Sequence, residues 1–310
     1  MIAAIGAFDG FHIGHQALLG RARVRAETLG GSWGTVTFSK HPDSLFYGPK
    51  FKYLFTAKEQ RCLEKYFSVP VSCRIDFTRR VADMAPGEFL DFISEKFGVT
   101  GIAVGEDFRF GKNRAGDCGV LRSECRRRGW DCSILDAMRL CGGAPLSSTA
   151  VREAVSAGDM TRVRSMLGYP FFCVSRVIHG NERGRGLGRP TANLEVSEEK
   201  AALRHGVYAT LVRACGKWYA GAANAGINPT FSDVSGTRFE INLIGFEGDL
   251  YGRDIAAFII ERVRDERKFG GAADLRRQID MDAAIVKQAG EKELASRGGF
   301  WEKWAAVLQM

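Results

Sequence analysis

The sequence predicts an α/β domain followed by an antiparallel β-barrel, and two features of its pattern lead to that prediction. In the first half, short apolar runs alternate with helix-like stretches, which is typical of βαβ units around a parallel sheet. In the second half, strand-like runs are separated by glycine-rich turns instead of helices, which favours an antiparallel barrel. The 310 residues, 45% of them hydrophobic and 26% charged, are enough for two such domains.

In the first half, each predicted strand is followed by a predicted helix. The strands are expected at 2–5, 35–38, 101–104 and 132–135, and the helices at 13–28, 58–67, 88–97 and 121–128. Two further helices, at 149–157 and 160–167, lead to Gly168-Tyr169-Pro170, whose glycine and proline are helix-stop signals. A domain covering 1–168 is therefore predicted.

The second half carries the predicted barrel, a helix and a tail. Strands are expected at 171–177, 207–212, 217–222, 239–244 and 255–263. A helix at 272–286 completes a second domain, 169–288, and a helical tail covers 289–310. In the tail, apolar side chains fall at helical spacing and are expected to dock onto a domain surface: Trp301, Trp304, Ala305 and Leu308.

Charge and composition narrow the cellular context. The net charge of +8 favours anionic partners, which leaves nucleotides, nucleic acid and anionic lipid open. No apolar run is long enough to span a membrane, and the apolar start soon meets Asp9 and His12, so a signal peptide is not expected. The eight cysteines form no CxxC pair, which argues against zinc ribbons and favours reduced, mostly buried thiols. We therefore expect a cytoplasmic protein.

The first candidate site follows the first predicted strand. Residues 6–15 read GAFDGFHIGH, and a helical pattern begins immediately afterwards. His12 and His15 would then stand at a helix N-terminus, where exposed N–H groups attract phosphate and glycines such as Gly6 let a ligand approach the backbone. Imidazoles can donate to α-phosphate oxygens as charge builds during adenylyl transfer. The motif therefore predicts nucleotide chemistry.

Two later segments add candidate ligand groups to this site. Asp107 follows a buried-type strand and would stand at its carboxyl end, where α/β sheets bind ligands. Ser148 and Thr149 open the helix that contains Arg152, which brings hydroxyls, free N–H groups and a guanidinium to one helix end. The alternatives are that Asp107 caps a turn and that the hydroxyls cap the helix.

The second half carries a second candidate site. Glycines and arginines alternate in the loop before Pro190, which suits phosphate binding or, alternatively, a flexible linker. Thr191 and Asn193 would share one face of an extended segment, and their oxygens are suitable ligands for Mg²⁺. Glu240, in a strand-like run, could accept the proton of a hydroxyl that attacks a phosphate, or it could simply face solvent.

Together these segments resemble one known family. The run GAFDGFHIGHQALL resembles the HxGH signature of nucleotidyltransferases, a superfamily that includes class I aminoacyl-tRNA synthetases. More narrowly, TFSKHP, VGEDFRFG and LSSTAVR are similar to the adenylyltransferase half of prokaryotic bifunctional riboflavin kinase/FAD synthetases. PTAN and the strand and turn at 239–252 resemble their kinase half. The resemblance covers about residues 1–288.

The resemblance implies both the fold and the activity. It implies a Rossmann-like nucleotidyltransferase domain followed by a riboflavin-kinase-type barrel. The implied reactions are phosphorylation of riboflavin to FMN by ATP with Mg²⁺, and adenylylation of FMN to FAD with release of pyrophosphate. Flavins and ATP are the implied partners; neither nucleic acid nor a membrane is expected, and the sequence carries no indication of oligomeric state.

The resemblance also assigns roles to residues of both halves. In the first half, the implied groups are the α-phosphate donors His12 and His15, the flavin contacts His41 and Pro42, and the nucleotide contacts Gly6, Phe8, Asp9, Asp107, Ser148, Thr149 and Arg152. In the second half, they are the nucleotide contacts Gly184 and Gly186, the metal ligands Thr191 and Asn193, and the base Glu240.

Three positions depart from the family pattern and leave alternatives open. Lys40 replaces the usual proline, Arg189 the usual phenylalanine and Asn228 the usual arginine. One half could therefore have lost its activity. The net charge and Arg126-Arg127-Arg128 also suggest a nucleic-acid-binding protein, although these arginines are explained more simply as a solvated helix face.

Overall fold

The computed structural model describes residues 1–139, 143, 145–179, 191–227, 237–267 and 269–310 and divides into two compact units. The first unit consists of Met1–Phe51 and Leu63–Ser148, and the second of Lys52–Cys62 and Thr149–Met310. Helices α7 (Ser148–Ala157) and α8 (Met160–Leu167) therefore belong to the second unit from Thr149 onward. The domain bounds 1–168, 169–288 and 289–310 stay predictions.

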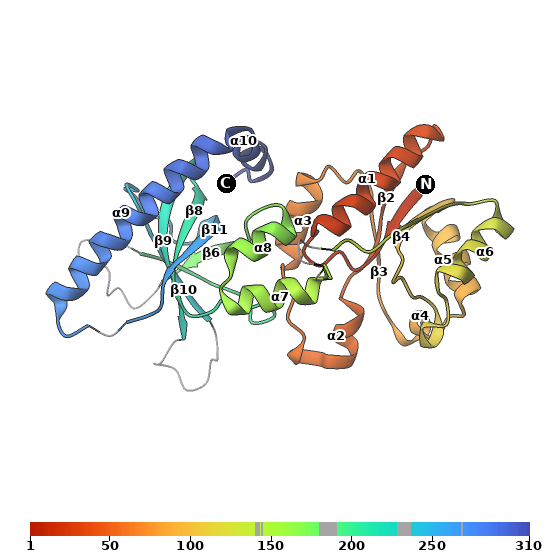
Figure 1. The fold of residues 1–310 in the computed structure, drawn as a ribbon, viewed down its shortest axis with the longest axis horizontal. Helices are drawn as coiled ribbons and strands as arrows, with labels where there is room; N and C mark the ends of the chain where they lie inside the picture. Colours follow the sequence, from red (N-terminus) through yellow and green to blue (C-terminus); the bar gives the residue numbers. More distant parts are fainter. Residues whose placement is uncertain (140–142, 144, 180–190, 228–236, 268) are drawn as a thin grey trace. The chain divides into compact units, whose positions relative to one another are not determined.

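The first unit is built on a five-stranded parallel sheet with the strand order β3-β2-β1-β4-β5 (Figure 1). The strands are β1 (Ile2–Ile5), β2 (Trp33–Phe38), β3 (Ser72–Ile75), β4 (Gly101–Gly105) and β5 (Asp131–Leu135). The strand order reverses between β1 and β4, because the chain leaves β1 toward β2 and returns on the other side to β4. This topological switch point is where open α/β sheets bind ligands.

Helices cover both faces of this sheet. Those that pack on the sheet are α1 (Ile13–Thr28), α5 (Pro86–Phe97) and α6 (Cys118–Arg128). The connections also contain α2 (Pro42–Tyr47), α4 (Arg79–Ala82) and the 3₁₀ turns η1 (Gly48–Lys50) and η2 (Lys112–Arg114), while α3 (Ala57–Tyr66) begins in the second unit and ends in the first. Right-handed crossovers place α1 on one face and α5 and α6 on the other. The core on the second face joins Ala3 and Ile5 of β1 to Leu90 of α5 and Leu121 of α6. The predicted α/β architecture is confirmed.

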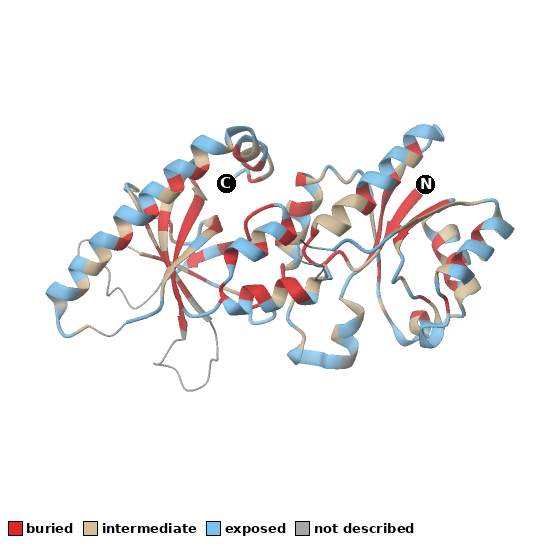
Figure 2. Cartoon of the chain, in the orientation of Figure 1, coloured by how far each residue is buried: buried red, intermediate tan, exposed pale blue. Residues whose placement is uncertain are grey.

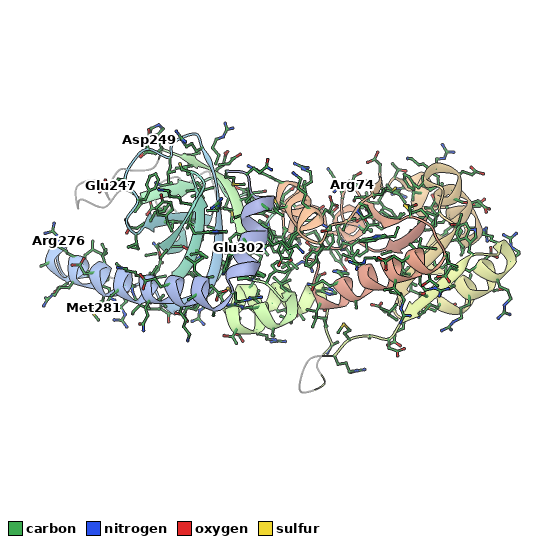
Figure 3. The ribbon with its side chains drawn as sticks, turned by 90° about the horizontal axis from the view of Figure 1, so that it is seen from above. Arg74, Glu247, Asp249, Arg276, Met281 and Glu302 are labelled. Carbon is green, nitrogen blue, oxygen red and sulfur yellow. The ribbon has the colours of Figure 1, made fainter. Side chains whose placement is uncertain are left out.

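The edge strand β3 was absent from the sequence prediction. Its residues, SCRI, alternate polar and apolar side chains without forming an apolar run. Ser72 hydrogen-bonds Glu64 at 2.8 Å, and Arg74 (labelled in Figure 3) forms an ion pair with the same carboxylate at 2.6 Å. The strand is therefore held by ladder hydrogen bonds and polar contacts that periodicity does not reveal.

The second unit is a closed antiparallel barrel with the order β10-β7-β6-β11-β8-β9, which confirms the predicted class. Its strands are β6 (Phe172–Ile178), β7 (Thr191–Leu194), β8 (Gly206–Ala214), β9 (Lys217–Ile227), β10 (Thr237–Leu243) and β11 (Asp254–Arg264). Figure 2 shows most of their length buried. Closure pairs each of these six strands on both sides, so the barrel has no open edge within the described residues.

A long helix, α9 (Ala272–Ser296), packs along β8, β9 and β11. The helix was predicted to end at residue 286, but it continues to Ser296. Gly290 explains how it lies so close to the barrel, because a Cβ there would stand 2.9 Å from the Cβ of Ala220. Met281, on the opposite side of α9, points away from the barrel and is 60% exposed (Figure 3).

The tail forms helix α10 (Gly298–Val307), which packs on the barrel wall. Trp301 and Trp304 are buried, and each makes an edge contact with Phe258, at centroid distances of 5.1 and 4.9 Å. Leu308 is buried as well. The predicted docking of the tail is confirmed.

Residues Lys52–Cys62 belong to the second unit although the sequence places them inside the first domain. Tyr53 forms a β-bridge with Lys200, and the Lys200 ammonium lies 2.6 Å from the Glu59 carboxylate. Glu59 also accepts the backbone N–H of Val174 at 2.9 Å. Both charged side chains are almost fully buried, so this ion pair fixes the segment to the barrel.

The seven described cysteines are all free thiols. Only Cys125 and Cys173 are buried, and Cys215 is exposed, so the expectation of mostly buried thiols was wrong. Among the helices that the structure describes, none combines the length and the apolar character that crossing a membrane requires.

Candidate functional site

The HxGH segment occupies the switch point of the sheet in the first unit. It connects the end of β1 at Ile5 to the start of α1 at Ile13, while Asp107 follows the end of the neighbouring strand β4. Burial lowers the pKa of the His12 imidazole, and the negative charge of Asp107 acts on the same imidazole and opposes part of that lowering. The structure therefore brings together the histidine motif and Asp107, as the sequence predicted.

The loop before α1 has a strained backbone that buried aromatic rings hold in place. Phe8 and Phe11 have φ values of 49° and 38°, in the left-handed region, where a non-glycine residue costs about 1–3 kcal/mol. Both side chains are 1% exposed, with ring centroids 5.5 Å apart, and Phe11 also stacks on Phe67. Burying these rings offsets the backbone cost.

Gln16 is a positioning residue that the sequence reasoning missed. Its side-chain amide donates to the Phe11 carbonyl at 2.7 Å and so fixes the strained turn from within α1. The sequence did contain one indication of this role: Gln16 directly follows His15, at the start of the predicted helix, where an amide side chain can reach the preceding loop.

His12 and His15 form a stacked pair at the N-terminus of α1. Their ring centroids lie 3.6 Å apart at an interplanar angle of 15°. His12 is the N-cap, and its Nδ1 accepts the backbone N–H of His15 at 3.3 Å, which places the ring proton on Nε2. A Cβ at Gly14 would lie 3.2 Å from the His12 ring, so glycine leaves this ring room to fold over the helix start.

Both imidazoles are neutral near pH 7. Burial lowers the pKa of His12 from 6.5 to about 4, although a backbone hydrogen bond and the charge of Asp107 act in the opposite direction. Burial also lowers the pKa of His15, and nearby His12 and His41 lower it further. The pair can therefore donate hydrogen bonds without carrying charge.

His41 and Ser148 lie in the same unit as the histidine pair. His41 caps α2, with its Nδ1 accepting the N–H of Asp43 at 3.1 Å, and Pro42 occupies the first turn of that helix. The hydroxyl of Ser148 donates to the Asp9 carbonyl at 2.7 Å, which ties the start of α7 to the HxGH loop.

The other proposed nucleotide contacts of the first half have different surroundings. Gly6 donates its N–H to the Val36 carbonyl at 3.2 Å, beside the end of β1. Thr149 and Arg152 belong to the second unit, where the guanidinium donates to the Thr149 hydroxyl at 3.4 Å. Lys40, which departs from the family pattern, is exposed.

In the second unit, strand pairing brings the predicted kinase residues together. Thr191 lies opposite Asn242, and Asn193 lies opposite Glu240, in the antiparallel pairing of β7 with β10. Directly opposed residues share a face of the sheet, so hydroxyl, amide and carboxylate form one polar patch. The flanking Ala192 is buried, whereas the polar residues are half-buried. Gly184, Gly186, Arg189 and Asn228 lie outside the described residues.

This patch fits a magnesium ion held mainly by a nucleotide. Thr191 and Asn193 offer one hydroxyl and one amide oxygen, which are hard ligands of the kind that Mg²⁺ uses. Within the part of the chain that the structure describes, no group of three or more His, Cys, Asp or Glu residues could hold a metal alone. A site with few protein ligands matches an ion that keeps phosphate oxygens and water.

The family models divide the chain in the same way as the two candidate sites. The model for FAD synthetase matches residues 1–150, and the model for riboflavin kinase matches residues 167–289. The bifunctional riboflavin kinase/FMN adenylyltransferase of Pseudomonas fluorescens is 33% identical over 92% of this chain and 92% of its own length. The chain belongs to the bifunctional riboflavin kinase/FMN adenylyltransferase family.

A second relative carries the same enzyme name, and a solved structure with a different description shares the fold. The bifunctional riboflavin kinase/FMN adenylyltransferase of Escherichia coli strain K12 is 33% identical over 93% of this chain and 92% of that protein. Among solved structures, one described as a macrolide-efflux protein from Streptococcus pneumoniae has a TM-score of 0.84 and 28% identity, covering 92% of this chain and 93% of that one.

Family membership establishes the activity. The enzyme phosphorylates riboflavin to FMN and adenylylates FMN to FAD, with ATP as the donor in both reactions. Mg²⁺ is the usual divalent ion of these families. The predictions of the family, of the enzyme class and of the substrates are confirmed.

Proposed function

We propose that each unit carries one of the two reactions. Adenylyl transfer would take place at His12, His15 and Asp107 in the first unit, and phosphoryl transfer at Asn193 and Glu240 in the second. One observation supports this division: each unit holds its own polar constellation, and each constellation lies within the range matched by one of the two family models.

Adenylyl transfer needs charge stabilisation more than proton transfer. The nucleophile is the FMN phosphate, which is already anionic, so a P–O bond to the α-phosphorus forms while the bond to pyrophosphate breaks, without a general base. Negative charge builds on the α-phosphate oxygens, where neutral N–H donors and the N-terminus of α1 can stabilise it. A His12 imidazole with a pKa of about 4 suits the role of hydrogen-bond donor.

Riboflavin phosphorylation does need a base, because the attacking group is a neutral hydroxyl. Glu240 would take this proton as the oxygen attacks the γ-phosphorus and ADP leaves. Thr191 and Asn193 would hold Mg²⁺, which, when bound, offsets phosphate charge. Asn193 lies directly opposite Glu240, so metal and base would act on the same phosphate.

The remaining site assignments are part of the same proposal. Nucleotide contacts are assigned to Gly6, Phe8, Asp9, Ser148, Thr149, Arg152, Gly184 and Gly186, and flavin contacts to His41 and Pro42. We also propose that the enzyme works in the cytoplasm, where ATP is abundant, and that its positive charge serves ATP and flavin phosphates instead of nucleic acid or a membrane.

Two variants test the division, each assayed for both reactions. In the double variant His12→Ala/His15→Ala, FAD formation from added FMN should fall at least about 100-fold, the usual cost of losing such donors, while FMN formation from riboflavin stays within about twofold. Glu240→Gln should lower FMN formation about 100-fold or more and spare FAD formation from added FMN. Circular dichroism controls for folding. Equal losses in both reactions for either variant would contradict the proposal.

A further inference from the structure

A third polar residue, Asn224, completes the row around Glu240. Asn224 on β9 lies directly opposite Glu240 on β10, and Asn193 on β7 lies opposite Glu240 on its other side. The three side chains therefore occupy one face of three neighbouring strands. Asn224 enters neither the metal site nor the proton transfer proposed above.

Asn224 is half-buried, and its side-chain oxygen has no hydrogen-bond partner among the described residues. Its Oδ1 atom has almost no exposed surface, and no partner reaches it among the described residues. An unsatisfied buried polar atom costs about 1–3 kcal/mol, and in native proteins a bound water, ion or ligand often supplies the partner of such an atom. Exchanging the oxygen and nitrogen ends of the amide would bury an N–H group instead, so the need for a partner remains.

Another hydrogen-bond acceptor stands over the same strand. Gly226 follows Asn224 by two positions and so shares its face. A Cβ at Gly226 would lie 2.6 Å from Oε1 of Glu266, so glycine leaves the space that this carboxylate occupies. The face therefore presents acceptors at Glu240, Asn224 and Glu266. Positions 224 and 226, two apart on β9, are separated by about 6–7 Å along the strand.

We propose that Asn224 binds the ribityl chain of riboflavin during phosphorylation. The ribityl chain carries several neighbouring hydroxyls, and each is a donor that could satisfy one of these acceptors. Oδ1 of Asn224 accepts from the 4′-hydroxyl, next to the reacting 5′-hydroxyl, and thereby holds the 5′-oxygen at Glu240. Glu266 accepts from a hydroxyl farther along the chain. This inference rests on the proposed role of Glu240.

The role predicts opposite effects on catalysis and on stability. Asn224→Ala removes the contact to substrate, so the KM for riboflavin should rise about tenfold, as expected for one lost hydrogen bond, while the KM for ATP stays unchanged. The same variant removes an unsatisfied buried atom, so the melting temperature should stay equal or rise. A merely structural asparagine would give a lower melting temperature and an unchanged KM for riboflavin.

The decisive experiment combines this variant with a substrate analogue. The wild type should bind 4′-deoxyriboflavin about tenfold more weakly than riboflavin, whereas Asn224→Ala should bind both alike, because the variant and the analogue each lack half of one hydrogen bond. Lys217→Ala, at the exposed start of the same strand, is the matched control and should behave as wild type. FAD formation from added FMN should remain normal throughout.

Failure of this inference is distinguishable from failure of the proposed function. If Glu240→Gln retains riboflavin phosphorylation, the proposed kinase site is wrong, and the inference falls with it. If Glu240→Gln abolishes phosphorylation but Asn224→Ala keeps the wild-type preference for the 4′-hydroxyl, only the role of Asn224 is overturned.

Discussion

Replacing His12 by asparagine should make the first unit more resistant to acid. In the wild type, Nδ1 of His12 caps α1 by accepting the N–H of His15. Asparagine is among the best N-cap residues, so its Oδ1 can take over this contact, while its amide does not titrate in this range. The variant therefore removes the buried titratable group and keeps the cap.

The expected size of the effect follows from the pKa of His12. Its value of about 4 in the folded protein, against 6.5 for an ordinary histidine, means that the unfolded chain binds more protons between these pH values. Stability therefore falls as pH drops from 6.5 to 4, by about 3 kcal/mol in total and about 2 kcal/mol between pH 7 and pH 5. Asp107 and His15 are retained in the variant, so the difference between the two proteins reports the His12 imidazole together with its effect on the pKa of His15.

Urea denaturation at pH 7 and pH 5, followed by circular dichroism, measures the difference. The wild type should lose about 2 kcal/mol more than His12→Asn over this interval. His205→Asn, which replaces an exposed histidine in the second unit, is the control and should leave the pH dependence unchanged. If His12→Asn and wild type show parallel pH dependence, the imidazole of His12 is not buried in its neutral form, and the charge-free donor role fails.

Two further predictions concern the second unit. Trp304→Ala should lower the free energy of unfolding by about 3–5 kcal/mol, because it replaces a large buried side chain by a small one. A melting temperature equal to that of the wild type would show that α10 is not part of the folded barrel. Glu59→Gln should lower the free energy of unfolding, measured by urea denaturation, by about 3–5 kcal/mol, because it leaves the buried ammonium of Lys200 without its counter-charge. The double variant Glu59→Gln/Lys200→Met should recover part of that loss. Equal stability of the two variants would contradict the burial of the pair.

The sequence predicted the elements whose periodicity is set by burial. Strand β1 occupies the predicted range 2–5 and is buried along its whole length, and helix α1 occupies the predicted range 13–28 and buries Leu18, Leu19, Ala22 and Ala26. The family resemblance assigned Asn193 and Glu240 to one site, although the expected strands included 239–244 and not 191–194, the range of β7. The register that sets them opposite each other depends on strand pairing across the barrel, which no local pattern encodes.

The electrostatic state of the histidine pair lay beyond sequence reasoning. The HxGH motif predicted two imidazoles at a helix start but left their charge open. Their neutrality depends on burial, and that burial depends on Phe8 and Phe11 folding inward through left-handed backbone conformations. Such conformations are disfavoured locally and persist only because the surrounding core stabilises them.

The segment Lys52–Cys62 shows the same limit at the level of domains. Local pattern assigns it to the α/β half, yet Glu59 pairs with Lys200, 141 positions later, inside the second unit. The pairing also supplies the carboxylate that accepts the Val174 N–H, so the barrel strand β6 depends on it. A buried lysine without its partner is strongly unfavourable. The residues after 168 close the barrel, but the counter-charge of its buried lysine comes from a segment that lies within the range matched by the FAD synthetase model.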